Sequence, residues 1–259
     1  MDILEQLLYI LDIIGTVAFA AAGAMVAIQE DSDLLGVVLC GVFTAQGGGA
    51  TRDLILGNTP PRMFRDWTDL ILAIATSLVI FLAVRLLQKK ILDHTALFDQ
   101  VVNIFDALGL AVFTVSGMNV ATGCGFGDNA LLTIFCGVCS AVGGGVLRDI
   151  VLRRKPFILY KEFYACACLI GAVLYYMLPY LDVPPLSALM LAMIAVFVLR
   201  MLATAYNWNL PKAIVGKENE HSHKSRRPAA FSRKNTRFTP HSPIPPPLLI
   251  QWKHEGRLL

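Results

Sequence analysis

Two glycine triplets, each followed by an Arg–Asp pair, are the residues of this sequence best suited to form a polar site. The first set is Gly47, Gly48, Gly49, Arg52 and Asp53, and the second is Gly143, Gly144, Gly145, Arg148 and Asp149. Three adjacent glycines weaken a helix, since each costs about 1 kcal/mol relative to Ala. A charged pair is costly within a membrane, where such residues mark transport paths. We therefore interpret both sets as helix breaks that line a pore or substrate path.

Each of these interpretations has an alternative. Close helix packing is the alternative for the triplets, and anchoring at the membrane surface is the alternative for the charged pairs. For the isolated glycines we favour packing; these are Gly15, Gly23, Gly109 and Gly117. The two side chains of each Arg–Asp pair point about 100° apart on a helix. We therefore expect the pairs to bond across spans rather than within themselves.

Two acids, Asp12 and Asp106, are candidate pore-lining residues nearer the starts of their helices. Stabilisation of the helix N-terminal dipole is an equally good explanation for them. No catalytic or metal-binding group accompanies these acids: no His lies in an apolar run, and Cys136 and Cys139 have zinc-like spacing without a second pair. We therefore expect no enzyme, metal or cofactor, and we interpret the two cysteines as core residues.

Long apolar helices must position these residues. The chain is 56% hydrophobic, with a mean hydropathy of +0.60, which is too apolar for an ordinary soluble domain. Runs of about 20 apolar residues are long enough to cross the hydrocarbon of a bilayer. The sequence predicts seven such spans, at about 4–28, 34–56, 67–87, 100–121, 130–152, 159–180 and 186–206.

The spans contain an internal repeat. Asp12, Gly15, Phe19 and Gly23 align with Asp106, Gly109, Phe113 and Gly117 at an offset of 94 residues. At an offset of 96, the first triplet with Arg52, Asp53 and Pro60 aligns with the second triplet, Arg148, Asp149 and Pro156. Each copy holds three spans, and an odd number forces the two copies into opposite orientations. The predicted fold is an all-α membrane protein of two inverted three-helix repeats plus one helix (3+3+1).

The same alignment sets the expected domains. Residues 1–95 form the first repeat, 96–181 the second and 182–211 the seventh helix, and 212–259 form a basic, proline-rich tail. The net charge is −4 for residues 1–211 and +7 for 212–259. We expect a disordered tail that contacts anionic lipid, and no nucleic-acid binding.

The basic residues of the loops predict the orientation in the membrane. One set of alternate loops holds eight of them and the other set three, which predicts a periplasmic N-terminus and a cytoplasmic C-terminus.

The triplets and charged pairs at 47–53 and 143–149 resemble the bacterial branch of the trimeric intracellular cation (TRIC) channels, a branch also described as a glycine-transporter domain family. The resemblance covers about residues 4–210. Animal members instead carry a basic–acidic motif beginning with Lys where Arg52 and Asp53 stand here. The resemblance implies an inner-membrane homotrimer in which each protomer has its own pore for monovalent cations, mainly potassium.

Two other functions remain open at this point. The same branch is linked to uptake of small amino acids, so a glycine transporter is the first alternative. A glycine site needs amides for the carboxylate and acids or carbonyls for the amine, whereas a cation path needs carbonyls and carboxylates. A membrane scaffold that transports nothing is the second alternative.

Overall fold

The computed structural model describes residues 3–86, 95–159, 163–206 and 208. Within these ranges every regular element is helical. The predicted tail at 212–259 and the residues at 87–94 lie outside the described residues, so the expected lipid contact of the tail stays a prediction.

Seven helices of the described chain are long and apolar enough to span a membrane. They are α1 (Ile3–Gln29), α2 (Leu34–Ile55), α4 (Thr68–Leu86), α6 (Thr95–Ala121), α7 (Ala130–Val151), α8 (Phe163–Met177), whose span continues to Leu181, and α9 (Pro185–Ala205). Short elements lie between them: α3 (Arg62–Arg65), a π-helical turn (η1, Thr122–Phe126) and two 3₁₀ turns (η2, Phe157–Leu159; η3, Leu178–Leu181). The predicted seven-span, all-α fold is therefore confirmed; among the described residues, the short helix α3 and the helical turns were not predicted by the apolar pattern.

Equivalent residues begin and end the two helices that carry the triplets. The Asp33 side chain accepts the backbone N–H of Gly36 at 2.7 Å at the start of α2. Asn129 accepts the N–H of Leu132 at 3.1 Å at the start of α7. Such side-chain caps satisfy N–H groups that the first helical turn leaves unpaired. Since Asp33 and Asn129 are 96 residues apart, the caps follow the repeat.

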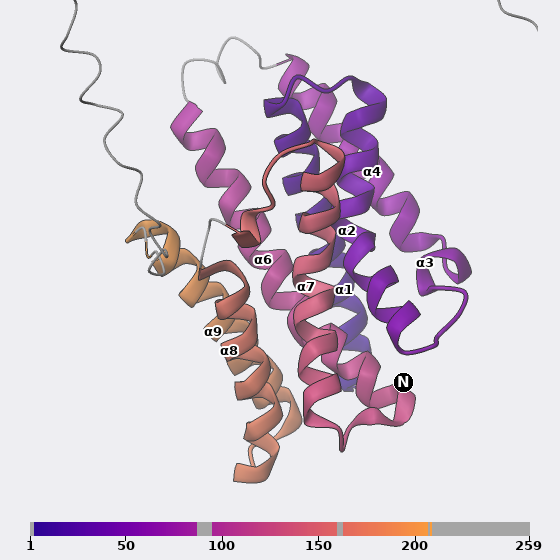
Figure 1. Ribbon diagram of the computed structural model, residues 1–259, viewed down its shortest axis with the longest axis vertical. Helices are drawn as coiled ribbons and strands as arrows, with labels where there is room; N and C mark the ends of the chain where they lie inside the picture. Colours follow the sequence, from indigo (N-terminus) through magenta and orange to yellow (C-terminus); the bar gives the residue numbers. More distant parts are fainter. Residues whose placement is uncertain (1–2, 87–94, 160–162, 207, 209–259) are drawn as a thin grey trace, which may run out of the picture. The chain divides into compact units, whose positions relative to one another are not determined.

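Four helices, α1, α2, α6 and α7, pack against one another in the centre (Figure 1). The α4 helix packs on α1 and α2, whereas α8 packs on α6 and α7 and α9 packs on α6 and α8. The central part of α1 is almost wholly buried, from Ala18 to Ala27. Its run of alanines and one glycine allows neighbouring backbones to approach closely, which is how membrane helices associate.

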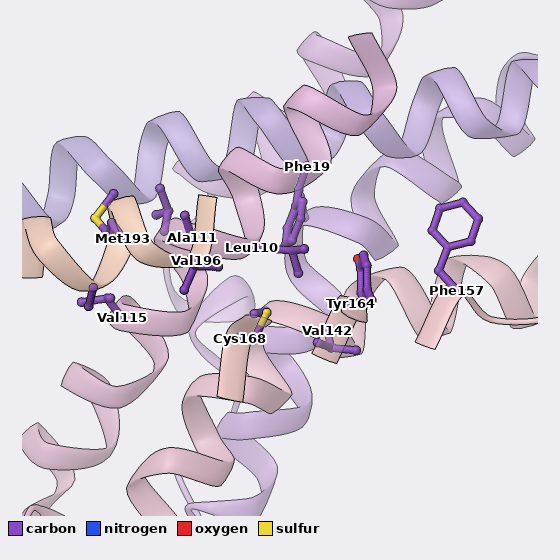
Figure 2. Packing of buried hydrophobic residues seen from close by; sticks show 14 of the residues in the cluster. Phe19, Leu110, Ala111, Val115, Val142, Phe157, Tyr164, Cys168, Met193 and Val196 are labelled. Atoms are coloured by element: carbon purple, nitrogen blue, oxygen red, sulfur yellow. The ribbon is translucent and has the colours of Figure 1, made fainter. Parts of the chain in front are cut away.

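The isolated glycines are packing residues, as predicted. A side chain at Gly109 would overlap the Phe19 ring, and one at Gly15 would lie 2.8 Å from Val112. Phe19 and Phe113, which are equivalent in the repeat, stack with ring centroids 5.3 Å apart. The main hydrophobic cluster then extends from Phe19 and Leu110 to α8 and α9 (Figure 2).

Candidate functional site

The first charged pair lies in the last turn of α2 and is buried. Arg52 donates from Nε and Nη2 to Oδ1 of Asp53, at 2.9 and 2.7 Å. The other oxygen of Asp53, Oδ2, accepts the backbone N–H of Arg62 at 2.8 Å. The expectation that the pair bonds across spans is therefore wrong. Two opposite charges at a helix end neutralise each other locally, which lowers the cost of burying them.

The second charged pair repeats this geometry at the end of α7. Arg148 donates from Nε to Oδ1 of Asp149 at 2.9 Å, and Oδ2 of Asp149 accepts the backbone N–H of Phe157 at 2.9 Å. Both side chains are completely buried. Phe157 thus takes the structural place of Arg62, and its ring centroid lies 4.9 Å from the guanidinium carbons of Arg148 and Arg154.

The glycine triplets do not break their helices. Helices α2 and α7 are each continuous through the triplet, so the predicted breaks are wrong. The triplets lie instead where α2 crosses α7. A Cβ atom on Gly48 would overlap the carbonyl oxygen of Ser140, and one on Gly144 would overlap that of Thr44. Glycine is required at the middle position because backbone meets backbone there.

The other glycines of each triplet have different neighbours. A Cβ on Gly47 would lie 2.7 Å from Leu147, and one on Gly143 would lie 3.1 Å from the Cα of Gly48, so the first glycines also serve the crossing. The third glycines face the charged pairs. A Cβ on Gly49 would lie 3.7 Å from Nη2 of Arg52, and one on Gly145 would lie 3.7 Å from Nη2 of Arg148. Each triplet therefore joins the helix crossing to a polar cluster.

The two acids each belong to one of these clusters. Asp12 accepts the Ser116 hydroxyl at 2.6 Å on Oδ1 and Nη1 of Arg62 at 3.0 Å on Oδ2. Asp106 accepts the Tyr164 hydroxyl at 3.1 Å on Oδ1. Both acids lie well beyond the first turn of α1 and α6. Because a helix dipole acts within the terminal turn, it does not explain them.

The first cluster borders a cavity of about 30 Å³. Its lining includes Asp12, Gly49, Arg52, Asp53, Arg62 and Asp69. That volume accepts one or two water molecules, since about 10–15 Å³ suffices for one. Three carboxylates and two guanidinium groups give the lining a formal charge of −1. Burial lowers the pKa of Arg62, but attraction to Asp12 and Asp69 outweighs burial and raises the pKa overall.

The second cluster is closed by residues that the sequence reading did not use. Tyr164, in the first turn of α8, is buried against Phe157 with ring centroids 6.3 Å apart. Figure 2 shows the two rings beside each other at one end of the hydrophobic cluster. Arg200, in α9, is also buried, and its guanidinium carbon lies 4.8 Å from the Tyr164 ring centroid.

A signal existed for some of the residues that were missed. Arg200 is a lone charge in an apolar span, and such residues face protein or a polar path. Asp69 lies in the first turn of another span. By contrast, Arg62 and Tyr164 carry no comparable sequence signal, because their importance depends on which helices lie beside them.

A sequence model of the glycine-transporter family matches residues 9–85 and 103–180. The chain belongs to this family. The two matched segments begin 94 residues apart, so the family pattern itself occurs twice, once over α1–α4 and once over α6–α8. The family is of the channel and transporter type, and the chain is a multi-pass membrane protein.

Relatives and solved structures agree with this assignment. The chain is 38% identical over 207 residues to the UPF0126 inner membrane protein YadS of Escherichia coli, covering 80% of this chain and 96% of that protein. A TRIC cation channel studied for its conductance aligns with a TM-score of 0.69 and 37% identity, over 80% of this chain and 97% of the other. A TRIC orthologue from Rhodobacter sphaeroides aligns with a TM-score of 0.69 and 30% identity, over 78% and 99%. The family that the sequence resembled is therefore confirmed.

Proposed function

We propose that this protein is a channel for monovalent cations, chiefly potassium, that works as a homotrimer in the inner membrane with one path in each protomer. The observation that carries the proposal is the cavity lined by Asp12, Asp53 and Asp69 beside the crossing of α2 and α7. Its carboxylates outnumber its guanidinium groups, and a negative lining favours cations. Similarity to solved cation channels of the trimeric type supports the same function.

The proposed path connects the two polar clusters through the helix crossing. It begins at the cavity, passes Gly49 and Arg52, and reaches Ser140, whose hydroxyl oxygen lies 3.5 Å from Nη1 of Arg52. It continues past Gly145 toward Arg148, Asp149 and Asp106. In this conformation the second half is sealed by Tyr164, so we infer a closed state that opens by movement at this cluster.

Glycine transport is the second candidate, and it is favoured by the description of the family. The cavity carries guanidinium groups for a carboxylate and carboxylates for an amine. Its volume of about 30 Å³ is the space of one or two waters, whereas glycine has five non-hydrogen atoms. The geometry therefore favours a monovalent cation that has shed most of its water.

The orientation and repeat boundaries belong to the same proposal. The N-terminus faces the periplasm and the C-terminus the cytoplasm, with repeats at 1–95 and 96–181 inverted relative to each other. Reporter fusions after Asp128 and Lys217 test this, with the first expected outside and the second inside. Two reporters on the same side would contradict the seven-span topology.

The function is tested by potassium flux and radiolabelled glycine uptake, measured side by side in liposomes that hold the purified protein. Potassium flux above that of empty liposomes is expected, with no glycine uptake. The Asp12→Asn variant should lower the flux because it removes a charge from the cavity. Asp99→Asn is the matched control, since Asp99 is an exposed acid of α6 that bonds Gln29. Glycine uptake without potassium flux would overturn the proposal.

A further inference from the structure

We propose that Arg62 is a tethered cation that occupies the mouth of the first cavity and competes there with the permeant ion. The inference rests on the proposed function and adds a mode of regulation to the same site. It is based on the position of the Arg62 guanidinium group among carboxylates of α1, α2 and α4.

The backbone of Arg62 is fixed at the end of α2. Its N–H is held by Asp53 at 2.8 Å, at the first residue of the short helix α3. This contact with the charged pair of α2 therefore fixes the point from which the Arg62 side chain extends.

The side chain reaches acids on two other helices. Nη1 of Arg62 lies 3.0 Å from Oδ2 of Asp12 in α1, and Nη2 lies 3.8 Å from Oδ2 of Asp69 in α4. Both acids line the cavity. A potassium ion that entered the cavity would meet the same two carboxylates. Ion and guanidinium therefore compete for one pair of negative charges.

The contact is weak enough to be reversible. The Arg62 side chain is 39% exposed, whereas the acids that it bonds are 12% exposed. Water screens an ion pair that has one solvated partner, and the long side chain loses freedom when it is fixed, so such a pair contributes less than a fully buried one. In the proposed competition, water or an ion replaces the guanidinium at the two acids.

The residue that makes the equivalent backbone bond in the second half carries no charge. Phe157 makes the equivalent backbone bond to Asp149 in the second half, and its side chain is an apolar ring that contacts Arg148. The backbone bond to the aspartate is therefore common to both halves, while the tethered charge is not. A purely structural need at this position would be met by either side chain.

Single-channel recording in planar bilayers of the purified protein tests the inference, with potassium as the only cation. Arg62→Gln should raise the open probability at low potassium by about two- to fivefold, which is the range of an exposed ion pair. The gain should shrink as potassium rises, because the ion then displaces Arg62 in the unmodified protein. Arg62→Lys should behave like the unmodified protein, since it keeps the charge.

Arg65→Gln is the matched control, because Arg65 lies on the same short helix, is exposed and forms no ion pair with any residue that the structure describes. An equal rise in open probability in Arg65→Gln would show that the effect comes from the general surface charge, and it would overturn the inference. So would an unchanged or lower open probability in Arg62→Gln.

A double-mutant cycle guards against an indirect effect. Asp69→Asn removes one of the acids that hold Arg62, so Arg62→Gln should raise the open probability less in the Asp69→Asn background than in the unmodified protein. Independent effects of the two substitutions would overturn the inference. If the unmodified protein conducts potassium and Arg62→Gln does not change its open probability, only the tethered cation is refuted. If neither the unmodified protein nor any variant carries current, the channel function is refuted as well.

Discussion

The two Arg–Asp clusters share one backbone design and differ in their access to water. In the first, the charged pair borders a cavity and the half-exposed Arg62. In the second, Arg148 and Asp149 are completely buried behind Phe157 and Tyr164. The hydrogen bond that a backbone N–H donates to the aspartate is alike in both, at 2.8 and 2.9 Å. The difference in access to water therefore comes from the surrounding side chains, since the local backbone geometry is the same in both repeats.

That difference teaches how two copies of one fold can take different roles. Among the described residues, Nη1 and Nη2 of Arg148 and Oδ2 of Asp106 have no hydrogen-bond partner. Buried polar atoms without partners are costly, and such cost concentrates where a site must rearrange. In the proposed channel, the first cluster admits the cation and the second cluster rearranges.

The largest expected effect separates the two arginines. Arg148→Ala should destabilise the protein by about 3–5 kcal/mol, because it leaves Asp149 charged and buried. Arg52→Ala should cost clearly less, because Asp53 borders the cavity and water can solvate it. Thermal unfolding in detergent, followed by size-exclusion recovery, gives both values under one set of conditions.

Asp149 would still keep the Phe157 N–H and Nε of Arg154 at 4.0 Å. The double variant Arg148→Ala with Asp149→Asn should therefore recover part of the loss, since it removes the unpaired charge. Equal losses for Arg52→Ala and Arg148→Ala would show that the two clusters are equally solvated.

The next effect tests what the halves share. Gly48→Ala and Gly144→Ala should each cost about 3 kcal/mol, the upper range for overpacking, because the obstacle to each new methyl group is a backbone carbonyl. The two losses should be alike, since each glycine faces the equivalent residue of the other helix. Thermal unfolding measures them, and a loss at only one position would contradict the reciprocal crossing.

The fold followed from the sequence because membrane helices depend on local composition. The apolar runs predicted all seven long helices, and the repeat predicted that Arg52 and Arg148 would occupy equivalent positions. Helix α3 was missed because its four residues carry no periodic pattern. Its position is set by the bond between Asp53 and Arg62, which is a tertiary contact.

The predicted residues lie at the helix crossing and in the two clusters beside it, whereas part of their predicted geometry is wrong. Both triplets and both charged pairs lie together, but the helices are continuous and each arginine bonds the adjacent aspartate. The low helix propensity of glycine suggested breaks at the triplets. Tertiary packing overrides that propensity, because the backbones of the two crossing helices approach each other so closely that only glycine fits. Their role in conduction stays a prediction.

A smaller effect concerns the acids. Tyr164→Phe should cost about 1–2 kcal/mol, because Asp106 then loses its hydroxyl partner inside a dry cluster. Ser116→Ala should cost less, since Asp12 keeps Arg62 and borders the cavity. Thermal unfolding of both variants gives the comparison. A greater loss for Ser116→Ala would reverse our assignment of the wet and dry clusters.

The smallest effect concerns the third glycines, Gly49 and Gly145. Replacement of a helical glycine by Ala gains up to about 1 kcal/mol when the methyl group has room. At Gly49 the nearest atom would be 3.7 Å away, so Gly49→Ala should slightly raise the unfolding temperature. At Gly145 the methyl group would lie 3.1 Å from the Tyr164 hydroxyl, so the gain should be cancelled unless that ring shifts. A Gly145→Ala protein as stable as Gly49→Ala would mean that Tyr164 moves at little cost, and the sealed cluster would then be as adaptable as the open one.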